Sequence, residues 1–271
     1  TMRIALKPLS AQGVDILAKQ AGRKDDRLFD ITEGNPFFVT ELLASSPSGG
    51  EEIPASVRDA VWSRIGRLAD RERELLEKIS IVPGSIETWL LHAMVGETAD
   101  AAVDSCVARG LVQRDGQGQL KFRHELARKA TLERLPLSVQ KALHGRVEEI
   151  LSQQAPTQLS RRVHHAAGAD DCEHVLALAP LAAAQSAGLG SHLEAASHLS
   201  TALKYVRDAT PELAATLYEN WAYEAGLALK IDDSIIAARH KAIALWRELG
   251  RVDKVGLNLR WLSRLHWYRG E

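Results

Sequence analysis

Apolar residues recur every three to four positions near the start of the chain, which is the spacing of helices that bury one face. Ser10 can cap the first of these helices, which we predict over residues 11–20. A second helix, predicted over residues 26–32, ends just before Gly34, a glycine suited to the position after a helix. Pro36 then opens a third helix, because the first helical position needs no N–H donor.

The segments that flank these helices have a different character. Residues 3–8 predict a short strand that ends at their proline. Residues 45–52, Ser-Ser-Pro-Ser-Gly-Gly-Glu-Glu, predict a linker, since turn-forming residues replace the periodic apolar ones. We therefore expect a first region over residues 1–46.

A second region, over residues 53–155, opens with further amphipathic helices. Apolar stripes indicate one helix around Val57, one around Leu75, one that opens near Ser85, and one over residues 100–109. These four helices are the first part of a predicted compact domain.

The hydrophobic period changes from 3.6 to about 2 over residues 111–123. Asp115 and Gly116 separate two short alternating runs there, which is a strong signal for a β-hairpin. Helices followed by one hairpin, and then by a helix from His124 onward, are typical of a winged-helix domain. A generic helical domain with one hairpin is the alternative.

The third region, residues 156–271, predicts only helices, paired over 158–186, 191–226 and 231–267. An alanine-rich segment at Ala195 recurs at Ala237, an offset of 42 residues. Small residues at matching positions let helices approach closely, as in a tetratricopeptide-like solenoid with longer helices. We expect this array to be truncated. The predicted fold is mainly α: a helical remnant, a winged helix with one β-hairpin, and a tetratricopeptide-like α-α solenoid.

The composition is that of an ordinary globular protein. The chain has 271 residues, of which 45% are hydrophobic and 25% are charged, with a formal net charge of -1. This charge indicates no general attraction to nucleic acid or to an anionic membrane. The first residues lack a signal peptide, and the two cysteines form no disulfide framework, so a cytoplasmic location is expected. A first residue other than Met suggests a domain cut from a longer protein.

Candidates for catalysis and metal binding are weak. No Ser-His-Asp or Cys-His arrangement stands out, so we expect neither a catalytic residue nor an enzyme activity in this chain. His164, His165, Cys172 and His174 are metal-binding residue types, but their spacing matches no tight zinc pattern. Adjacent histidines on a helix are expected to point apart, so no metal site is predicted.

Three segments carry a resemblance to a known family. They are Gly-Asn-Pro-Phe-Phe-Val-Thr-Glu-Leu-Leu at 34–43, Ile-Pro-Ala-Ser-Val-Arg-Asp-Ala-Val at 53–61 and Phe-Arg-His-Glu-Leu-Ala-Arg at 122–128. They resemble the large ATP-binding LuxR-type regulators, which are bacterial transcriptional regulators of the STAND class of ATPases. The resemblance implies that residues 1–46 are the end of an ATPase core and its helical lid. No G-x-x-x-x-G-K-[ST] loop occurs, so the chain lacks the cradle for a triphosphate.

The resemblance also implies nucleotide-sensing residues, which act only in a longer protein that binds ATP or ADP with Mg. Gly34, Asn35 and Pro36 match the element that packs against adenine, and Pro36 offers a flat apolar surface for it. His124 matches the histidine that reaches a phosphate of ADP, although Arg123 and Glu125 depart from the family pattern. The alternatives are a simple helix start at Gly34 and a packing role for His124. No cofactor is expected in this chain by itself.

The predicted function is signal transmission, which couples nucleotide state to the binding of an effector. The expected partners are the ATPase core that precedes this chain and an effector or protein on the repeats, at the exposed members of Trp221, Tyr223, Trp246 and Trp261. Most of these aromatics could instead belong to the core. DNA would be bound through a C-terminal helix-turn-helix outside this chain, and no membrane partner is expected.

Two further alternatives stay open. The winged helix could bind DNA itself, but residues 53–155 hold 15 basic and 14 acidic residues and no basic wing tip. The same module also occurs in STAND ATPases that are fused to a cyclase or a kinase.

Overall fold

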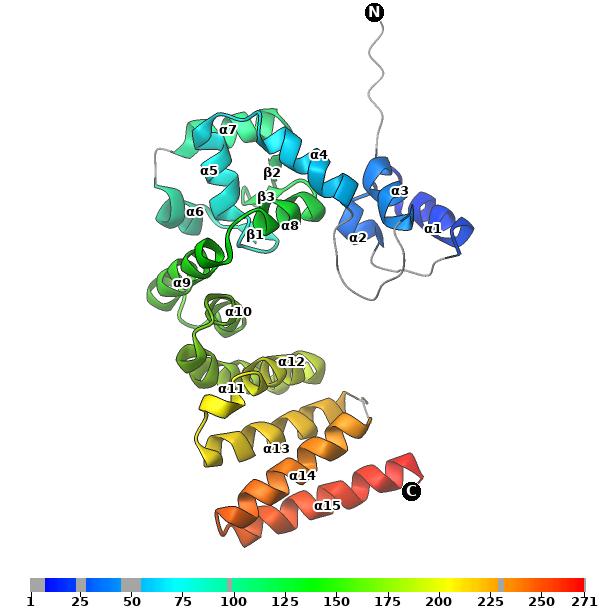
Figure 1. The fold of residues 1–271 in the computed structure, drawn as a ribbon, viewed down its shortest axis with the longest axis vertical. Helices are drawn as coiled ribbons and strands as arrows, with labels where there is room; N and C mark the ends of the chain where they lie inside the picture. Colours follow the sequence, from blue (N-terminus) through cyan, green and yellow to red (C-terminus); the bar gives the residue numbers. More distant parts are fainter. Residues whose placement is uncertain (1–7, 23–27, 45–54, 97–98, 229–231, 271) are drawn as a thin grey trace, which may run out of the picture. The chain divides into compact units, whose positions relative to one another are not determined.

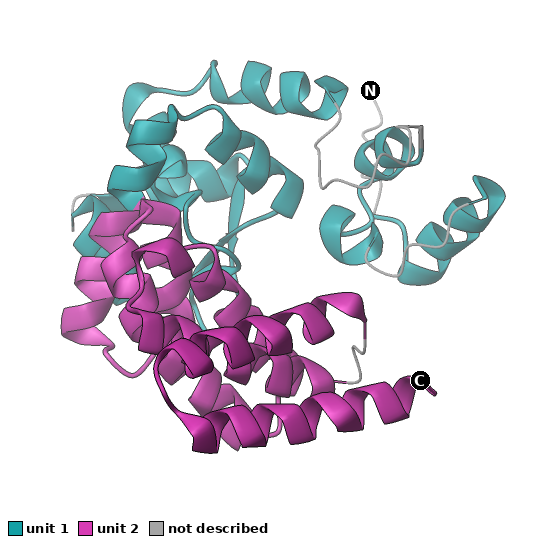
Figure 2. Ribbon diagram, turned by 60° about the horizontal axis from the view of Figure 1, so that its bottom comes forward, with its two compact units in different colours: residues 1–143 teal, residues 144–271 magenta. Residues whose placement is uncertain are grey.

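The computed structural model describes residues 8–22, 28–44, 55–96, 99–228 and 232–270. The chain divides into two compact units, residues 1–143 and residues 144–271, which Figure 2 shows in separate colours. The predicted strand at the start and the predicted linker after position 44 lie largely outside the described residues. The predicted region boundaries at 46, 53 and 156 remain predictions.

The described part of the first unit begins with three short helices (Figure 1), α1 (Ala11–Gln20), α2 (Leu28–Thr32) and α3 (Pro36–Ala44). Ser10 caps α1 as predicted, since its hydroxyl accepts a hydrogen bond from the N–H of Gly13. The helices share a small core built around Val14, Ala18, Leu28 and Val39. This apolar contact holds α3 in place, and therefore the motif at its start.

The rest of the first unit combines helices with one small sheet. Its elements are α4 (Ala55–Ile65), α5 (Asp70–Ile79), β1 (Ser85–Ile86), α6 (Thr88–Val95), α7 (Asp100–Ala108), β2 (Val112–Arg114), β3 (Leu120–Phe122) and α8 (Glu125–Glu133). The sheet is antiparallel in the order β1-β3-β2, and β2 and β3 form the predicted hairpin.

β1 corrects one expectation, because a helix was predicted to open near Ser85. Ser85 instead pairs with Lys121 and Ile86 pairs with Leu120, and the helix begins at Thr88. Two residues are too few to show a hydrophobic period, so no periodic pattern marks this strand. Pairing with β3 satisfies their backbone groups.

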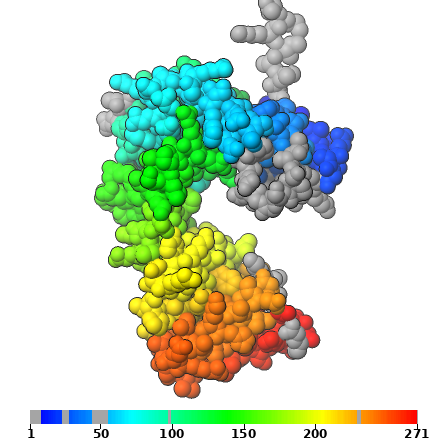
Figure 3. Space-filling model, in the orientation of Figure 1, coloured from blue at the N-terminus to red at the C-terminus, as the bar shows by residue number. Residues whose placement is uncertain are grey.

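Helix α9 (Leu137–Gln154) carries the boundary between the two units. The described part of the second unit continues with helices only: α10 (Leu159–Ala169), α11 (Cys172–Gly188), α12 (His192–Leu203), the 3-10 helix η2 (Val206–Asp208), α13 (Pro211–Leu227), α14 (Asp233–Glu248) and α15 (Val252–Arg269). Figure 3 shows α11 to α15 as one continuous body, coloured from yellow-green to red. Its core is rich in alanine, including Ala179, Ala182, Ala195 and Ala202, which lets neighbouring helices pack closely.

The repeated alanine segment does not occupy equivalent faces of its two helices. Ala195 and Ala202 in α12 are fully buried, whereas Ala237 and Ala244 in α14 are exposed. The 42-residue offset therefore repeats only part of the packing, since the matching residues Ala196 and Ala238 are both buried. The pairing of successive helices is nevertheless that of a helical repeat array, and the predicted mainly α fold is confirmed. The predicted hairpin is part of a three-stranded antiparallel sheet, because β1 adds to it.

Among the described residues, no helix combines the length and the apolar character needed to cross a membrane.

Candidate functional site

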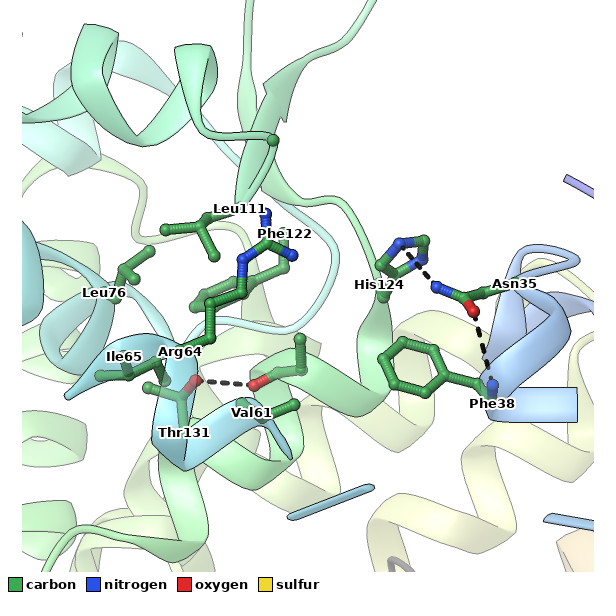
Figure 4. A pocket seen from close by; sticks show the side chains of 12 residues that line it. Asn35, Phe38, Val61, Arg64, Ile65, Leu76, Leu111, Phe122, His124 and Thr131 are labelled. Atoms are coloured by element: carbon green, nitrogen blue, oxygen red, sulfur yellow. Dashed lines mark hydrogen bonds between the residues drawn. The ribbon is translucent and has the colours of Figure 1, made fainter. Parts of the chain in front are cut away.

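The two predicted nucleotide-sensing motifs lie in contact within the first unit. The side-chain Nδ2 of Asn35 lies 3.5 Å from Nε2 of His124, although the two residues are 89 positions apart in the chain. The ring of Phe38 packs edge-on against the imidazole, with 5.2 Å between ring centroids and 85° between ring planes. Figure 4 shows Asn35 between the imidazole and the start of α3.

Local backbone chemistry explains why the Gly-Asn-Pro sequence occurs at this position. Gly34 has a φ of 71°, and a Cβ on it would lie 2.1 Å from the carbonyl oxygen of Leu9. The two residues are this close because the N–H of Leu9 donates to the carbonyl of Gly34. The Oδ1 of Asn35 accepts hydrogen bonds from the N–H groups of Phe37 and Phe38, so Asn35 caps α3. Pro36 is exposed at the first position of that helix.

The contact with Asn35 determines the tautomer of His124. Nδ2 of Asn35 is a donor, so Nε2 of His124 must accept and the ring proton must be on Nδ1. Nδ1 is buried, and it has no hydrogen-bond partner among the described residues. His124 therefore presents an enclosed N–H that could donate to a water or to an anionic oxygen.

The surroundings of His124 keep its ring neutral. Burial lowers the pKa of His124, the positive charges of Arg123 and Arg64 act in the same direction, and together they bring it to about 4. A neutral imidazole with the proton on Nδ1 is both an acceptor for Asn35 and a donor for another group.

A small cavity adjoins this contact. Its volume is about 70 Å³, and residues from α3, α4, α5, α8 and the hairpin line it, including Phe38, Arg64, Phe122 and His124. Pockets that enclose a drug-sized ligand measure roughly 300–1,000 Å³, so this cavity admits water and not a nucleotide. Phe38 and Arg64 were not singled out from the sequence as site residues. Only the folded structure shows that these two residues lie beside His124.

The aromatic residues predicted to bind a partner divide into two groups. Tyr223 is 38% exposed, and Trp221 and Trp261 are half-buried. The rings of Tyr223 and Trp261 meet edge-on at 5.1 Å, and the guanidinium of Arg264 lies 5.3 Å from the ring centre of Trp261. These residues retain surface that a partner could contact.

Trp246 belongs instead to the core, because only 2% of it is exposed. Its Nε1–H donates to the buried carboxylate of Glu219 at 2.8 Å. Asn258 donates to the same carboxylate and accepts from Arg239, so the four side chains form one network across α13, α14 and α15. Trp246 therefore is not part of an exposed binding face, and the core alternative considered for these aromatics applies to it.

The metal-binding residue types also lie in unexpected places. His164 and His165 lie close together, with 5.0 Å between ring centroids, and His144 of α9 joins them. The expectation that these adjacent rings point apart is therefore wrong, since an imidazole is long enough for both to reach the same third ring. His174 lies apart, paired with Asp171 at 2.8 Å. Burial lowers the pKa of His165 to about 2.

Comparisons with known proteins give one structural likeness. No family model matches the chain, and no curated protein sequence matches it. A solved structure of a STAND protein with a tetratricopeptide repeat sensor from Pyrococcus horikoshii aligns with 98% of this chain and 52% of its own, at 14% identity and a TM-score of 0.40. The chain thus spans about half the length of that protein, and a likeness at this level does not assign it to a family.

Proposed function

We propose that this chain is the signal-transmission part of an ATP-controlled switch of the STAND class, of the kind found in large ATP-binding LuxR-type transcriptional regulators. The observation that carries the proposal is the contact between Asn35 and His124. These two residues come from the two motifs that resemble nucleotide-sensing elements, and the fold brings them together from distant parts of the sequence.

The chemistry of the contact suits a sensor. The adenine would pack against the exposed ring of Pro36, and the N–H of His124 would donate a hydrogen bond to a phosphate oxygen. A bound nucleotide would supply the negative charge that a donor in this position stabilises. The enclosed cavity has no room for a nucleotide in the present arrangement, so α3 and α8 must separate for His124 to meet one. Asn35 would then lose its contact with His124.

In this proposal the hairpin domain is a winged helix that transmits the state of the lid. The repeats would receive an effector at Trp221, Tyr223 and Trp261, and the partners would be a preceding ATPase core and DNA bound by a following helix-turn-helix. ATP or ADP with Mg would be held by that longer protein in the cytoplasm. A STAND parent with a cyclase or kinase output would use the same contact in the same way.

Direct DNA binding by the hairpin domain is less well supported. In a helix-turn-helix the second helix enters the major groove, and α7 holds that position here. Its sequence, Asp-Ala-Ala-Val-Asp-Ser-Cys-Val-Ala, contains two acidic residues and no basic one. The turn between β2 and β3 has no basic residue either. A surface of this charge repels phosphates.

The test uses the longer protein that the proposal requires, with a phosphate-binding loop ahead of this chain. His124→Ala should speed spontaneous ADP release about 10- to 100-fold, because a hydrogen bond to a charged group contributes about 1.5–3 kcal/mol. Reporter expression without inducer should rise together with it.

Thr40→Ala is the matched control, because Thr40 is exposed on the same helix α3 and its hydroxyl bonds to the carbonyls of Pro36 and Phe37 in that helix. It should leave ADP release unchanged. Wild-type ADP release in a folded His124→Ala protein would mean that His124 only packs, and the proposed function would be rejected.

A further inference from the structure

Three histidines from two helices converge at the start of the second unit. His144 lies on α9, and His164 and His165 lie on α10. One ring nitrogen from each of them lies within 4.8 Å of the other two. His144 and His165 are buried, and His164 is exposed, so the group reaches the surface on one side.

A glycine lets the two helices approach closely at this point. A Cβ on Gly168 of α10 would lie 2.4 Å from the ring of His144, which is shorter than any normal contact. Gly168 is one turn after His164 on the same helix, so the gap left by its missing side chain receives the ring of His144 beside the other two histidines. The convergence is therefore built into the packing of α9 against α10.

The two buried rings face one another through the same type of atom. Nδ1 of His144 lies 3.0 Å from Nδ1 of His165. Two such nitrogens can approach this closely only with a proton or another cation between them, because two lone pairs repel. Tetrahedral zinc, with Zn–N bonds of about 2.0–2.1 Å, places two ligand nitrogens about 3.3 Å apart. A small outward movement of one ring would reach that spacing.

We propose that His144, His164 and His165 form a binding site for a divalent transition-metal ion, with Zn²⁺ as the expected occupant. Three imidazoles are a known ligand set for zinc, with water in the fourth position. His164 lies at the exposed edge, where such a water can enter. The three ligands include no carboxylate, which disfavours Ca²⁺ and Mg²⁺. The ion would join α9 to α10 and stabilise the beginning of the helical repeats.

The experiment measures Zn²⁺ binding to the whole chain by calorimetry after chelator treatment. Wild-type protein should bind a single Zn²⁺, and Zn²⁺ should raise its melting temperature. Co²⁺ in place of Zn²⁺ should give the visible absorption of a four-coordinate site with three nitrogen ligands and one water. His164→Ala should weaken Zn²⁺ binding by at least about 10-fold, since even the loss of an outer partner of a ligand costs that much. This variant should fold, because His164 is exposed.

Two controls separate metal binding from other effects. His174→Ala removes an exposed histidine that pairs with Asp171 on the surface, and it should leave Zn²⁺ affinity unchanged. Gly168→Ala removes no ligand but displaces the ring of His144, so it should weaken binding. Gly145→Ala should not weaken binding, since a Cβ there would meet Ala169 at an ordinary 3.9 Å.

Either of two results would overturn the proposal. The first is no Zn²⁺ binding by folded wild-type protein, which would leave a hydrogen-bonded histidine cluster. The second is equal Zn²⁺ affinity in wild type and His164→Ala, which would place the ion elsewhere.

Discussion

Asn35 and His124 are the N-caps of two helices, α3 and α8, and their side chains meet at 3.5 Å. The Oδ1 of Asn35 is used by the backbone of its own helix, and its Nδ2 faces the imidazole. One side chain thus both starts a helix and connects it to a second one. A substitution of either residue should therefore lower the stability of the first turns of both helices.

This coupling between Asn35 and His124 can be measured with a double-mutant cycle. Asn35→Ala alone should cost about 1 kcal/mol as a lost helix cap, in addition to the lost contact. The cycle with His124→Ala removes the cap contribution and should leave a coupling of about 0.5–1.5 kcal/mol. Hydrogen exchange at the amides of Ala127 and Arg128, which donate to the carbonyl of His124, reports the free energies. Asn35→Ala with Gln117→Ala, an exposed hairpin residue, should be additive. No coupling between Asn35 and His124 would contradict the contact.

The low pKa of His124 predicts a loss of stability in acid. Its pKa is about 4 in the folded protein, against about 6.5 in an unfolded chain. Between these values the unfolded state binds more protons, so the free energy of unfolding falls as the pH falls from about 6.5 to about 4. The contribution of His124 is fully present above pH ~6.5 and amounts to at most about 3 kcal/mol.

Chemical unfolding at a series of pH values checks this prediction, with His124→Gln as the comparison. The variant should lose less stability than wild type across that range. Parallel pH profiles for the two proteins would show that His124 is not buried as a neutral ring.

Gly34→Ala should strongly destabilise the first unit. A side chain at this position would require both a left-handed backbone and a Cβ 2.1 Å from the Leu9 carbonyl oxygen. We expect a loss of at least about 2 kcal/mol, measured as increased hydrogen exchange of α1 and α3. Gly116→Ala in the hairpin turn is the control, since no atom lies within 4 Å of a Cβ there. Equal effects of the two substitutions would mean that the backbone around Gly34 is free to adjust.

Trp246→Phe should destabilise the second unit by about 1–3 kcal/mol, because it removes a donor from the buried carboxylate of Glu219. Trp261→Phe, at a half-buried position with no buried carboxylate to satisfy, should cost less. Denaturant unfolding followed by circular dichroism compares the two. If Trp261→Phe were the more damaging, the assignment of Trp246 to the core network would be wrong.

The chain by itself should not bind Mg-ATP or Mg-ADP measurably, because it contains no phosphate-binding loop. Calorimetry should show no heat of binding. A dissociation constant below about 100 μM would contradict the proposal that a preceding ATPase core binds the nucleotide.

Local sequence signals predicted most of the elements. Ser10 as a cap, the Asp-Gly turn at Asp115 and the proline at position 36 each act over a few residues, so a single sequence reveals them. The amphipathic stripes located the paired helices of the repeat region for the same reason. β1 was missed because two residues have no period, and its existence depends on pairing with β3.

The tertiary structure alone decided which side chains meet. Asn35 and His124 were each singled out from the sequence, yet only the packing of α3 against the hairpin domain brings them into contact. The recurring alanines predicted that α12 and α14 bury the same face, but Ala237 is exposed whereas Ala195 is buried. Burial depends on the neighbouring helices. His144 lies 20 residues before His164 and shares no local pattern with it. Contacts between segments far apart in the chain depend on how helices pack, and no short-range spacing of residues records that.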